Sequence, residues 1–411
     1  MAKRLASICV LLAFGLCLGV ATSEMLVRLV VPLSDFLWQW DPLIGMKLIP
    51  GKHGRSVKAG LYDVDVEVNS VGFRDQEHTL GKPSGTCRIA ILGDSFMEAL
   101  QVPFVSSTTH RLQKELQTSG LSSETMNFGV SGASTAREYL TMRSYALPYR
   151  PDLVVLFFVV NDFGGNTREL KGLSYLPYPQ TKPDGTLVVD EKGHPVFAPF
   201  YDQQSRFPAL ATWLRDYSKT YRLIRELMDT LPAPADTWDR VVRASGSTAV
   251  PQNVSASNAD LGPYEIYRSQ LKAKWSKATR VTEQLLVEMR DLATENGAEF
   301  AVVLVPPAFE VYPERWRELL DLTPQMKEAE LQPDQPLGNL QRFLDENRVR
   351  VINLLPDFTA HVHEASNLYL RDDGHWTAAG HAIAAHAVSE FSVRILNSKS
   401  RCANAPISVS N

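Results

Sequence analysis

The hydrophobic residues of this chain gather in short runs, and stretches of helical periodicity fill most of the distance between them. The runs predict strands over 87–92, 125–127, 153–160, 300–305 and 349–353. The periodic stretches predict helices over 107–119, 133–147, 264–296, 337–347 and 376–396. Continuous apolar strands are typical of a parallel sheet that is buried on both faces. Strands that alternate with helices therefore predict an α/β fold around a parallel sheet.

Residues 164–262 interrupt this alternation and predict an insertion after the third strand. The segment is rich in proline, and one helix is predicted within it, over 209–231. Long insertions in compact domains often cover a site. The Ser-, Asn- and Ala-rich part from 244 to 260 is equally typical of a poorly ordered surface excursion.

The N-terminus has the pattern of a segment that enters a membrane. Two basic residues, Lys3 and Arg4, precede an uncharged apolar stretch from Leu5 to Thr22. This pattern is shared by cleaved secretory signals and by membrane anchors. Small residues at 21–23 allow cleavage, but apolar character resumes over 25–33 and favours an uncleaved anchor. We therefore expect an inner-membrane anchor with the rest of the chain on the periplasmic or extracellular side; cleavage would make the protein secreted.

The chain between this anchor and the core is expected to be an extension of the domain. Residues 38–52 have the Pro and Gly content of a linker, and alternating residues over 61–68 predict a half-exposed strand. The expected division is a signal anchor or signal peptide, a juxtamembrane linker with an N-terminal extension, a core domain and a tail, at 1–24, 25–87, 88–396 and 397–411.

Composition narrows the classes of function. The 411 residues are 44% hydrophobic and 21% charged, with a formal net charge of −4, which is ordinary for a globular protein. No basic run interleaved with aromatic residues is present, so a nucleic-acid partner is not expected. Cys87 and Cys402 could form a disulfide in an oxidising compartment, and the sequence leaves that pairing open. No Cys/His spacing suggests a metal site, and we expect no cofactor.

A serine and a histidine at opposite ends of the core carry the first chemical signal. Ser95 follows the strand 87–92 in a Gly-Asp-Ser turn, at the edge where α/β sheets bind ligands. A serine hydroxyl needs a base to become a nucleophile. His375, which follows two aspartates closely, is the natural base. Alone, each residue would more often be a turn serine or a structural histidine.

Four segments in order resemble the sequence blocks of the SGNH (GDSL) hydrolase superfamily. They are Gly93-Asp94-Ser95, Asn127 to Gly132, Val160 to Phe163 and Asp372 to Trp376. The stretch Asn69 to Asp75 is similar to the lead-in of membrane-anchored bacterial members. The resemblance implies a three-layer fold with a flavodoxin-like parallel sheet of about five strands.

The resemblance also implies roles for particular residues. Ser95 would be the nucleophile and one oxyanion donor through its N–H, with Gly132 and Asn161 as the other donors. His375 would be the base. The family's usual spacing points to Asp372 as the orienting acid, whereas the Asp-x-His-Trp form of anchored polysaccharide acetyltransferases points to Asp373, which we favour.

One departure from the family pattern lies near the third donor. The family usually has a glycine two residues before its asparagine, and this chain has Val159 there. The backbone freedom around Asn161 is therefore an open question, although its side-chain amide is not affected.

These inferences predict an extracytoplasmic serine esterase. Its substrate would be an acylated small molecule or carbohydrate, with O-acyl or O-acetyl groups of cell-envelope carbohydrate favoured by location and family analogy. The first alternative is a polysaccharide O-acetyltransferase, which would use the same triad and pass the acyl group to a sugar hydroxyl. The second alternative is a non-catalytic carbohydrate-binding or assembly module.

Overall fold

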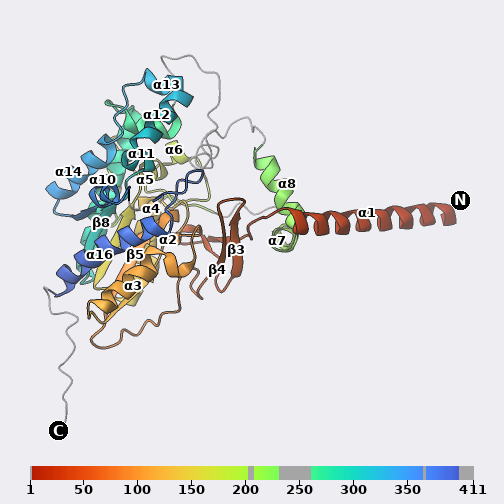
Figure 1. Cartoon of the computed structure of the whole chain (residues 1–411), viewed down its shortest axis with the longest axis horizontal. Coiled ribbons are helices and arrows are strands. Elements are labelled where there is room, and N and C mark those ends of the chain that lie inside the picture. Colours follow the sequence, from red (N-terminus) through yellow and green to blue (C-terminus); the bar gives the residue numbers. More distant parts are fainter. Residues whose placement is uncertain (1, 202–207, 231–260, 364–366, 398–411) are drawn as a thin grey trace, which may run out of the picture.

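Five parallel strands form the sheet at the centre of the molecule (Figure 1). The computed structural model describes residues 2–201, 208–230, 261–363 and 367–397. The strands are β5 (Cys87–Gly93), β6 (Ser123–Asn127), β7 (Leu153–Phe158), β8 (Glu299–Leu304) and β9 (Arg350–Asn353). Their order is β6-β5-β7-β8-β9, and every neighbouring pair is parallel. This is the flavodoxin order, and the predicted α/β fold is confirmed.

Helices cover both faces of this sheet. One face packs against α4 (Thr135–Thr141), α10 (Ala273–Glu295) and α14 (Gln335–Glu346). The opposite face packs against α3 (Thr108–Thr118), α15 (Leu355–Ala360) and α16 (Ala378–Asn397). Side chains alternate between the two faces along a strand, so all six residues of β7 are buried.

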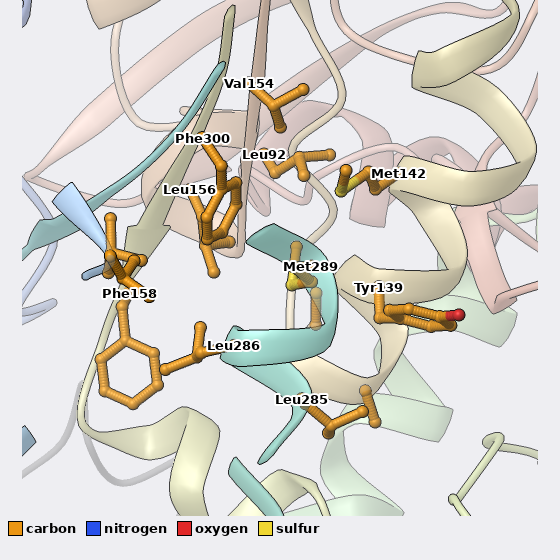
Figure 2. Packing of buried hydrophobic residues seen from close by; sticks show 14 of the residues in the cluster. Leu92, Tyr139, Met142, Val154, Leu156, Phe158, Leu285, Leu286, Met289 and Phe300 are labelled. Carbon is orange, nitrogen blue, oxygen red and sulfur yellow. The ribbon is translucent and has the colours of Figure 1, made fainter. Parts of the chain in front are cut away.

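The packing on the first face shows what holds a helix against the sheet. Leu286 and Met289 of α10 are buried against strand residues that include Leu156 and Phe158 (Figure 2). Burial of each such side chain contributes about 1.5–3 kcal/mol to stability. This contribution explains why the strongly apolar segments could be placed from the sequence.

The region before the sheet contains more structure than expected. Residues 38–52, expected to be a linker, instead form an antiparallel hairpin of β1 (Trp38–Asp41) and β2 (Gly45–Leu48). The strand expected over 61–68 is β4 (Tyr62–Glu67), which pairs with β3 (His53–Lys58). The β1–β2 hairpin forms because Leu37, Ile44 and Leu48 are buried against the rest of the protein.

A single long helix, α1 (Ala2–Val30), precedes this region and projects away from the sheet (Figure 1). Within the described part of the chain, it alone is long and apolar enough to cross a membrane, over Val10–Val30. Only 6% of this apolar stretch is buried. A helix of this length and composition near the N-terminus is compatible with an anchor or with a signal sequence.

The insertion after β7 departs from the predicted helices. The helix expected over 209–231 is two helices, α7 (Pro208–Tyr217) and α8 (Lys219–Thr230). They are separated at Ser218, whose hydroxyl accepts a hydrogen bond from the N–H of Tyr221 and caps the second helix. Leu231, the last residue of the predicted helix, lies outside the described residues. The Ser-, Asn- and Ala-rich segment 244–260 lies outside them as well.

The helix expected over 264–296 also begins late. A 3₁₀ turn, η4 (Gly262–Tyr267), comes first, and the α-helix starts at Ala273. The backbone of Arg268 forms an isolated antiparallel β-bridge with Leu331, which keeps the chain extended between the two helical segments. Cys87 is buried and disulfide-bonded, and Cys402, the partner that the sequence offers, lies outside the described residues.

The remaining short elements connect these layers. They are α2 (Ser95–Glu98), η1 (Phe104–Ser106), η2 (Met142–Ala146), η3 (Leu147–Tyr149), α5 (Asn161–Gly165), α6 (Arg168–Lys171), α11 (Ala308–Val311), α12 (Pro313–Leu322) and α13 (Pro324–Lys327). Two of them, α2 and α5, begin at candidate site residues.

Candidate active site

Ser95 lies where the chain leaves β5 and enters the one-turn helix α2. Asp94 is the N-cap of this helix, and its Oδ1 accepts a hydrogen bond from the N–H of Phe96 at 3.0 Å. This cap fixes the turn, and Ser95 begins the helix at the carboxyl edge of the sheet. Its Oγ is 2.7 Å from Nε2 of His375. The nucleophile and base candidates, 280 residues apart in sequence, are therefore in hydrogen-bond contact.

His375 is held between a carboxylate and the ring of Phe96. Its Nδ1 is 2.5 Å from Oδ1 of Asp373. The ring of Phe96 lies 5.1 Å from the imidazole and 5.0 Å from the ring of Trp376, centroid to centroid. Asp372 is exposed, and its contact is made by its backbone carbonyl rather than by its carboxylate. Of the two aspartates left open by the sequence, Asp373 is the one that touches the histidine.

A lysine from the N-terminal extension reaches the same aspartate. Lys58, the last residue of β3, places Nζ 2.8 Å from Oδ2 of Asp373 and 2.8 Å from the carbonyl oxygen of Asp372. Burial alone would raise the pKa of Asp373. The hydrogen bonds and positive charges of His375 and Lys58 outweigh this effect and lower the pKa to about 2. Asp373 is therefore a carboxylate throughout the physiological pH range.

Sequence reasoning missed Lys58. Its contact with Asp373 spans 315 positions, and β3 was not among the predicted strands. A lone lysine at the end of an unpredicted strand carries no signal that distinguishes it from a solvated surface residue. Only the tertiary position of the hairpin β3–β4 identifies it.

The candidate oxyanion donors lie on the two neighbouring strand ends. The Nδ2 of Asn161 donates to Oδ2 of Asp94 at 3.2 Å, which ties the end of β7 to the turn that carries Ser95. The turn before Asn161 is closed by Asp162, whose carboxylate accepts from the N–H of Val159 at 3.0 Å. The backbone turns here without a glycine at position 159.

Gly132 belongs to a loop that runs along the Ser95 turn. The N–H of Val130 donates to the carbonyl oxygen of Gly93 at 3.0 Å. Gly132 has a φ of +66°, a conformation that side chains with a Cβ rarely adopt, and its own surroundings are open. Gly129 differs, because a Cβ there would lie 2.6 Å from the backbone of Met97 and Glu98. The loop therefore packs directly on α2.

Buried acids surround this arrangement. Burial raises the pKa of Glu138 and of Asp162 well above the usual range, and the charges of neighbouring carboxylates add to the effect. Burial also raises the pKa of Glu98 to about 7, although it accepts hydrogen bonds from Ser131 and from Nε1 of Trp38. The described residues contain no group of three or more His, Cys, Asp or Glu side chains able to hold a metal ion.

The geometry is that of an activated nucleophile. A serine oxygen contacts a histidine nitrogen, and the other nitrogen of that ring contacts a carboxylate that stays ionised. Such an arrangement can withdraw the serine proton while the oxygen attacks an electrophilic carbon, and it stabilises the imidazolium that forms. The chemistry it fits is acyl transfer.

Comparison with known proteins gives a family match for the C-terminal part. Residues 266–400 match the family described as SGNH hydrolase-like domain, acetyltransferase AlgX. This range contains Asp373 and His375 but not Ser95, and it is less than half of the chain. No curated protein matches the sequence.

Solved structures of low sequence identity also match. The acetyl xylan esterase AlAXEase is 13% identical, covers 74% of this chain and 98% of its own, and has a TM-score of 0.35. TesA is 11% identical, covers 75% and 99%, and has a TM-score of 0.37. A lipolytic protein of the G-D-S-L family from Veillonella parvula is 11% identical, covers 75% and 99%, and has a TM-score of 0.36.

Proposed function

Because the chain carries an SGNH hydrolase-like domain, we propose that it is an extracytoplasmic serine esterase that forms an acyl-enzyme on Ser95. The observation that carries this proposal is the unbroken series of contacts from Asp373 through His375 to Oγ of Ser95. These contacts support the proposed roles of the three groups.

The first half-reaction follows from these contacts. Nε2 of His375 takes the proton of Ser95 as Oγ bonds to the carbonyl carbon of the ester. The carbonyl oxygen then carries a negative charge, which the N–H groups of Ser95 and Gly132 and the amide of Asn161 would stabilise. His375 returns the proton to the alcohol oxygen, the ester bond breaks, and the acyl group remains on Oγ.

The second half-reaction repeats these steps with water. His375 takes a proton from a water molecule whose oxygen attacks the acyl carbon, and the proton then returns to Oγ of Ser95 as the carboxylic acid leaves. Asp373 remains ionised throughout, because its pKa of about 2 lies far below the working pH. Its role is to hold one tautomer of the imidazole and to stabilise the imidazolium.

The proposed substrates are O-acyl groups of cell-envelope carbohydrate, O-acetyl groups above all. The family description concerns an acetyltransferase, and a solved relative in fold is an acetyl xylan esterase. The proposed location is the outer side of the inner membrane, with α1 as the anchor and the basic residues Lys3 and Arg4 on the cytoplasmic side.

A second candidate function is O-acetyl transfer to a sugar hydroxyl. The matched family favours it, and so does the contact of His375 with Asp373, which is the pairing expected of the Asp-x-His-Trp form. The acyl-enzyme would be the same, and the hydroxyl of an acceptor sugar would replace water in the second half-reaction.

The proposed nucleophile can be tested with a serine-reactive fluorophosphonate probe. The wild type is expected to be labelled, whereas Ser95→Ala and His375→Ala are not. Ser276→Ala, which changes an exposed serine, should be labelled like the wild type. Labelling that survives Ser95→Ala would refute the proposal, and an unlabelled wild type would favour a non-catalytic carbohydrate-binding module.

Product analysis separates hydrolysis from transfer. The wild type is incubated with an aryl acetate, with and without an oligosaccharide acceptor. Acetate released at the same rate in both reactions identifies an esterase. Acetylated oligosaccharide formed at the expense of acetate identifies a transferase.

A further inference from the structure

The helices α7 and α8 are fastened to the end of α1 that leads into the rest of the chain. The carboxylate of Glu24 in α1 accepts hydrogen bonds from the hydroxyl of Ser218 and from the N–H groups of Lys219 and Thr220, at 2.9, 2.9 and 3.1 Å. A carboxylate in a largely apolar helix thus caps the first turn of α8. This contact gives a reason for the single acidic residue of α1.

A second contact fixes the junction between the two helices. Nη2 of Arg28 donates to the carbonyl oxygen of Tyr217, the last residue of α7, at 2.6 Å. Glu24 and Arg28 lie in the last two turns of the part of α1 that is able to cross a membrane. The α7–α8 pair is therefore attached where α1 would leave a bilayer.

Both helices expose large apolar side chains at helical spacing. In α7 these are Leu210, Trp213 and Tyr217, and in α8 they are Ile224, Leu227 and Met228. Each of the six is at least half exposed. Positions three and four apart lie on one face of a helix, so each helix presents an apolar stripe to its surroundings. Exposed apolar surface of this extent on a folded protein marks a site of contact with another protein or with a membrane.

The neighbouring surface of α1 indicates which of these makes the contact. Met25, Leu26, Leu29 and Val30 of α1 are also largely exposed, and they continue the same apolar region. In Figure 1, α8 runs across the direction of α1 rather than along it. A helix attached at the end of a spanning helix and directed across it has the orientation of one that lies in the membrane plane.

We propose that α7 and α8 lie in the lipid–water interface beside α1, with their apolar stripes turned into the bilayer. The rings of Trp213 and Tyr217 are 6.0 Å apart, and these two residue types are enriched at that depth. The charged residues of the two helices nearly cancel, so apolar burial rather than attraction to anionic lipid drives the contact. This proposal rests on α1 crossing a membrane and not on the chemistry at Ser95.

The contact would also orient the core relative to the membrane. Arg222 of α8 donates to the carbonyl oxygen of Ser34 at 2.6 Å and to Oδ1 of Asp35 at 3.2 Å. Asp35 in turn accepts from the N–H of Arg55 in β3 at 2.9 Å. β3 ends at Lys58, which touches the candidate active site. The interfacial helices are thus joined by hydrogen bonds to the extension that packs against the site.

Fluorescence quenching in vesicles tests this proposal. The full chain is reconstituted into phosphatidylcholine vesicles that carry bromine either near the head groups or deep in the acyl chains. Trp213 is expected to be quenched most by the shallow bromines, so Trp213→Phe should lose this component. Trp316→Phe, which removes a partly buried tryptophan of the core, should keep it. Added anionic lipid should not change the result.

The outcomes decide between the possible occupants of the apolar stripes. Equal quenching of the wild type and Trp213→Phe by shallow bromines would overturn the proposal, even if the protein remains in the vesicles. Cross-links between copies through α8, without shallow quenching, would also overturn it in favour of a second copy of the chain. Fluorophosphonate labelling of the same vesicles reports Ser95 separately, so failure of one proposal does not imply failure of the other.

Discussion

At the scale of single residues, the sequence offered two aspartates, Asp372 and Asp373, as the acid that orients His375. The orientation of their side chains in the structure distinguishes them. Asp373 points its carboxylate at Nδ1 of His375, whereas Asp372 is exposed. Asp373→Asn is expected to lower kcat by a factor of about 10⁴, because an amide no longer selects the correct imidazole tautomer. Asp372→Asn should leave kcat unchanged. The test is the steady-state turnover of an aryl acetate, and an equal loss in both variants would contradict this assignment.

Lys58 has a distinguishable effect on the same site. Its ammonium group offsets part of the negative charge that Asp373 presents to His375. Lys58 also donates a hydrogen bond to Oδ2 of Asp373, and this contact helps to hold the carboxylate against Nδ1 of His375. Lys58→Met is therefore expected to lower kcat for an aryl acetate, because Asp373 loses this partner and orients the imidazole less firmly.

Lys58→Arg is the matched control, because it keeps the charge and a hydrogen-bond donor and should keep kcat close to that of the wild type. Urea unfolding of both variants shows whether a lower kcat results from lost stability instead. A folded Lys58→Met variant with the kcat of the wild type would show that the contact has no influence on the site.

Residues differ in how far their place in the site could be predicted. Ser95 and His375 were proposed because family blocks flank them, and the two side chains are in contact. Their roles, like those of Gly132 and Asn161, stay predictions. Lys58 could not be found, because a contact across more than three hundred positions leaves no trace in local pattern or motif.

At the scale of elements, Glu98 joins three of them. It lies in α2, and its carboxylate accepts hydrogen bonds from Ser131 in the loop after β6 and from Trp38 in β1. Burial raises its pKa from 4.5 to about 7. Between these two values the folded state binds the proton that the unfolded state has released, so stability falls as pH rises. The loss amounts to about 3 kcal/mol at pH 7 and above.

Glu98→Gln removes this titration and keeps the shape of the side chain. As pH rises from 4.5 to 7, the free energy of unfolding of the wild type is expected to fall relative to that of Glu98→Gln, by up to about 3 kcal/mol. Urea unfolding at a series of pH values measures the difference. Glu314→Gln, at an exposed position, is the control. A difference between Glu98→Gln and wild type that stays constant with pH would contradict the prediction.

The elements that could be predicted are those whose residues are buried on every side. β7 and β8 are nearly continuous apolar runs, and their positions were correct within two residues. The hairpin β1–β2 was missed because its strands have four residues each and are held by packing against the core. The division between α7 and α8 depends on contacts of Ser218 and Glu24, which are distant in sequence.

At the scale of the whole molecule, α1 contributes nothing to the three hydrophobic clusters among the described residues. It forms hydrogen bonds with the segment that joins α7 to α8, at Tyr217, Ser218, Lys219 and Thr220. A fragment that begins at Pro32 keeps Ser34 and Asp35, which bond to β3.

We therefore expect this fragment to fold without detergent and to unfold in urea at the same midpoint as the full chain. Fluorophosphonate labelling and hydrolysis of a soluble aryl ester should also be retained, because none of the contacts among Ser95, His375, Asp373 and Lys58 involves α1. The full chain in detergent micelles is the reference for both measurements. A fragment that is folded but inactive would mean that α1 acts on the site, for example through the hydrogen bonds that join α1 to α8 and α8 to the segment before β3.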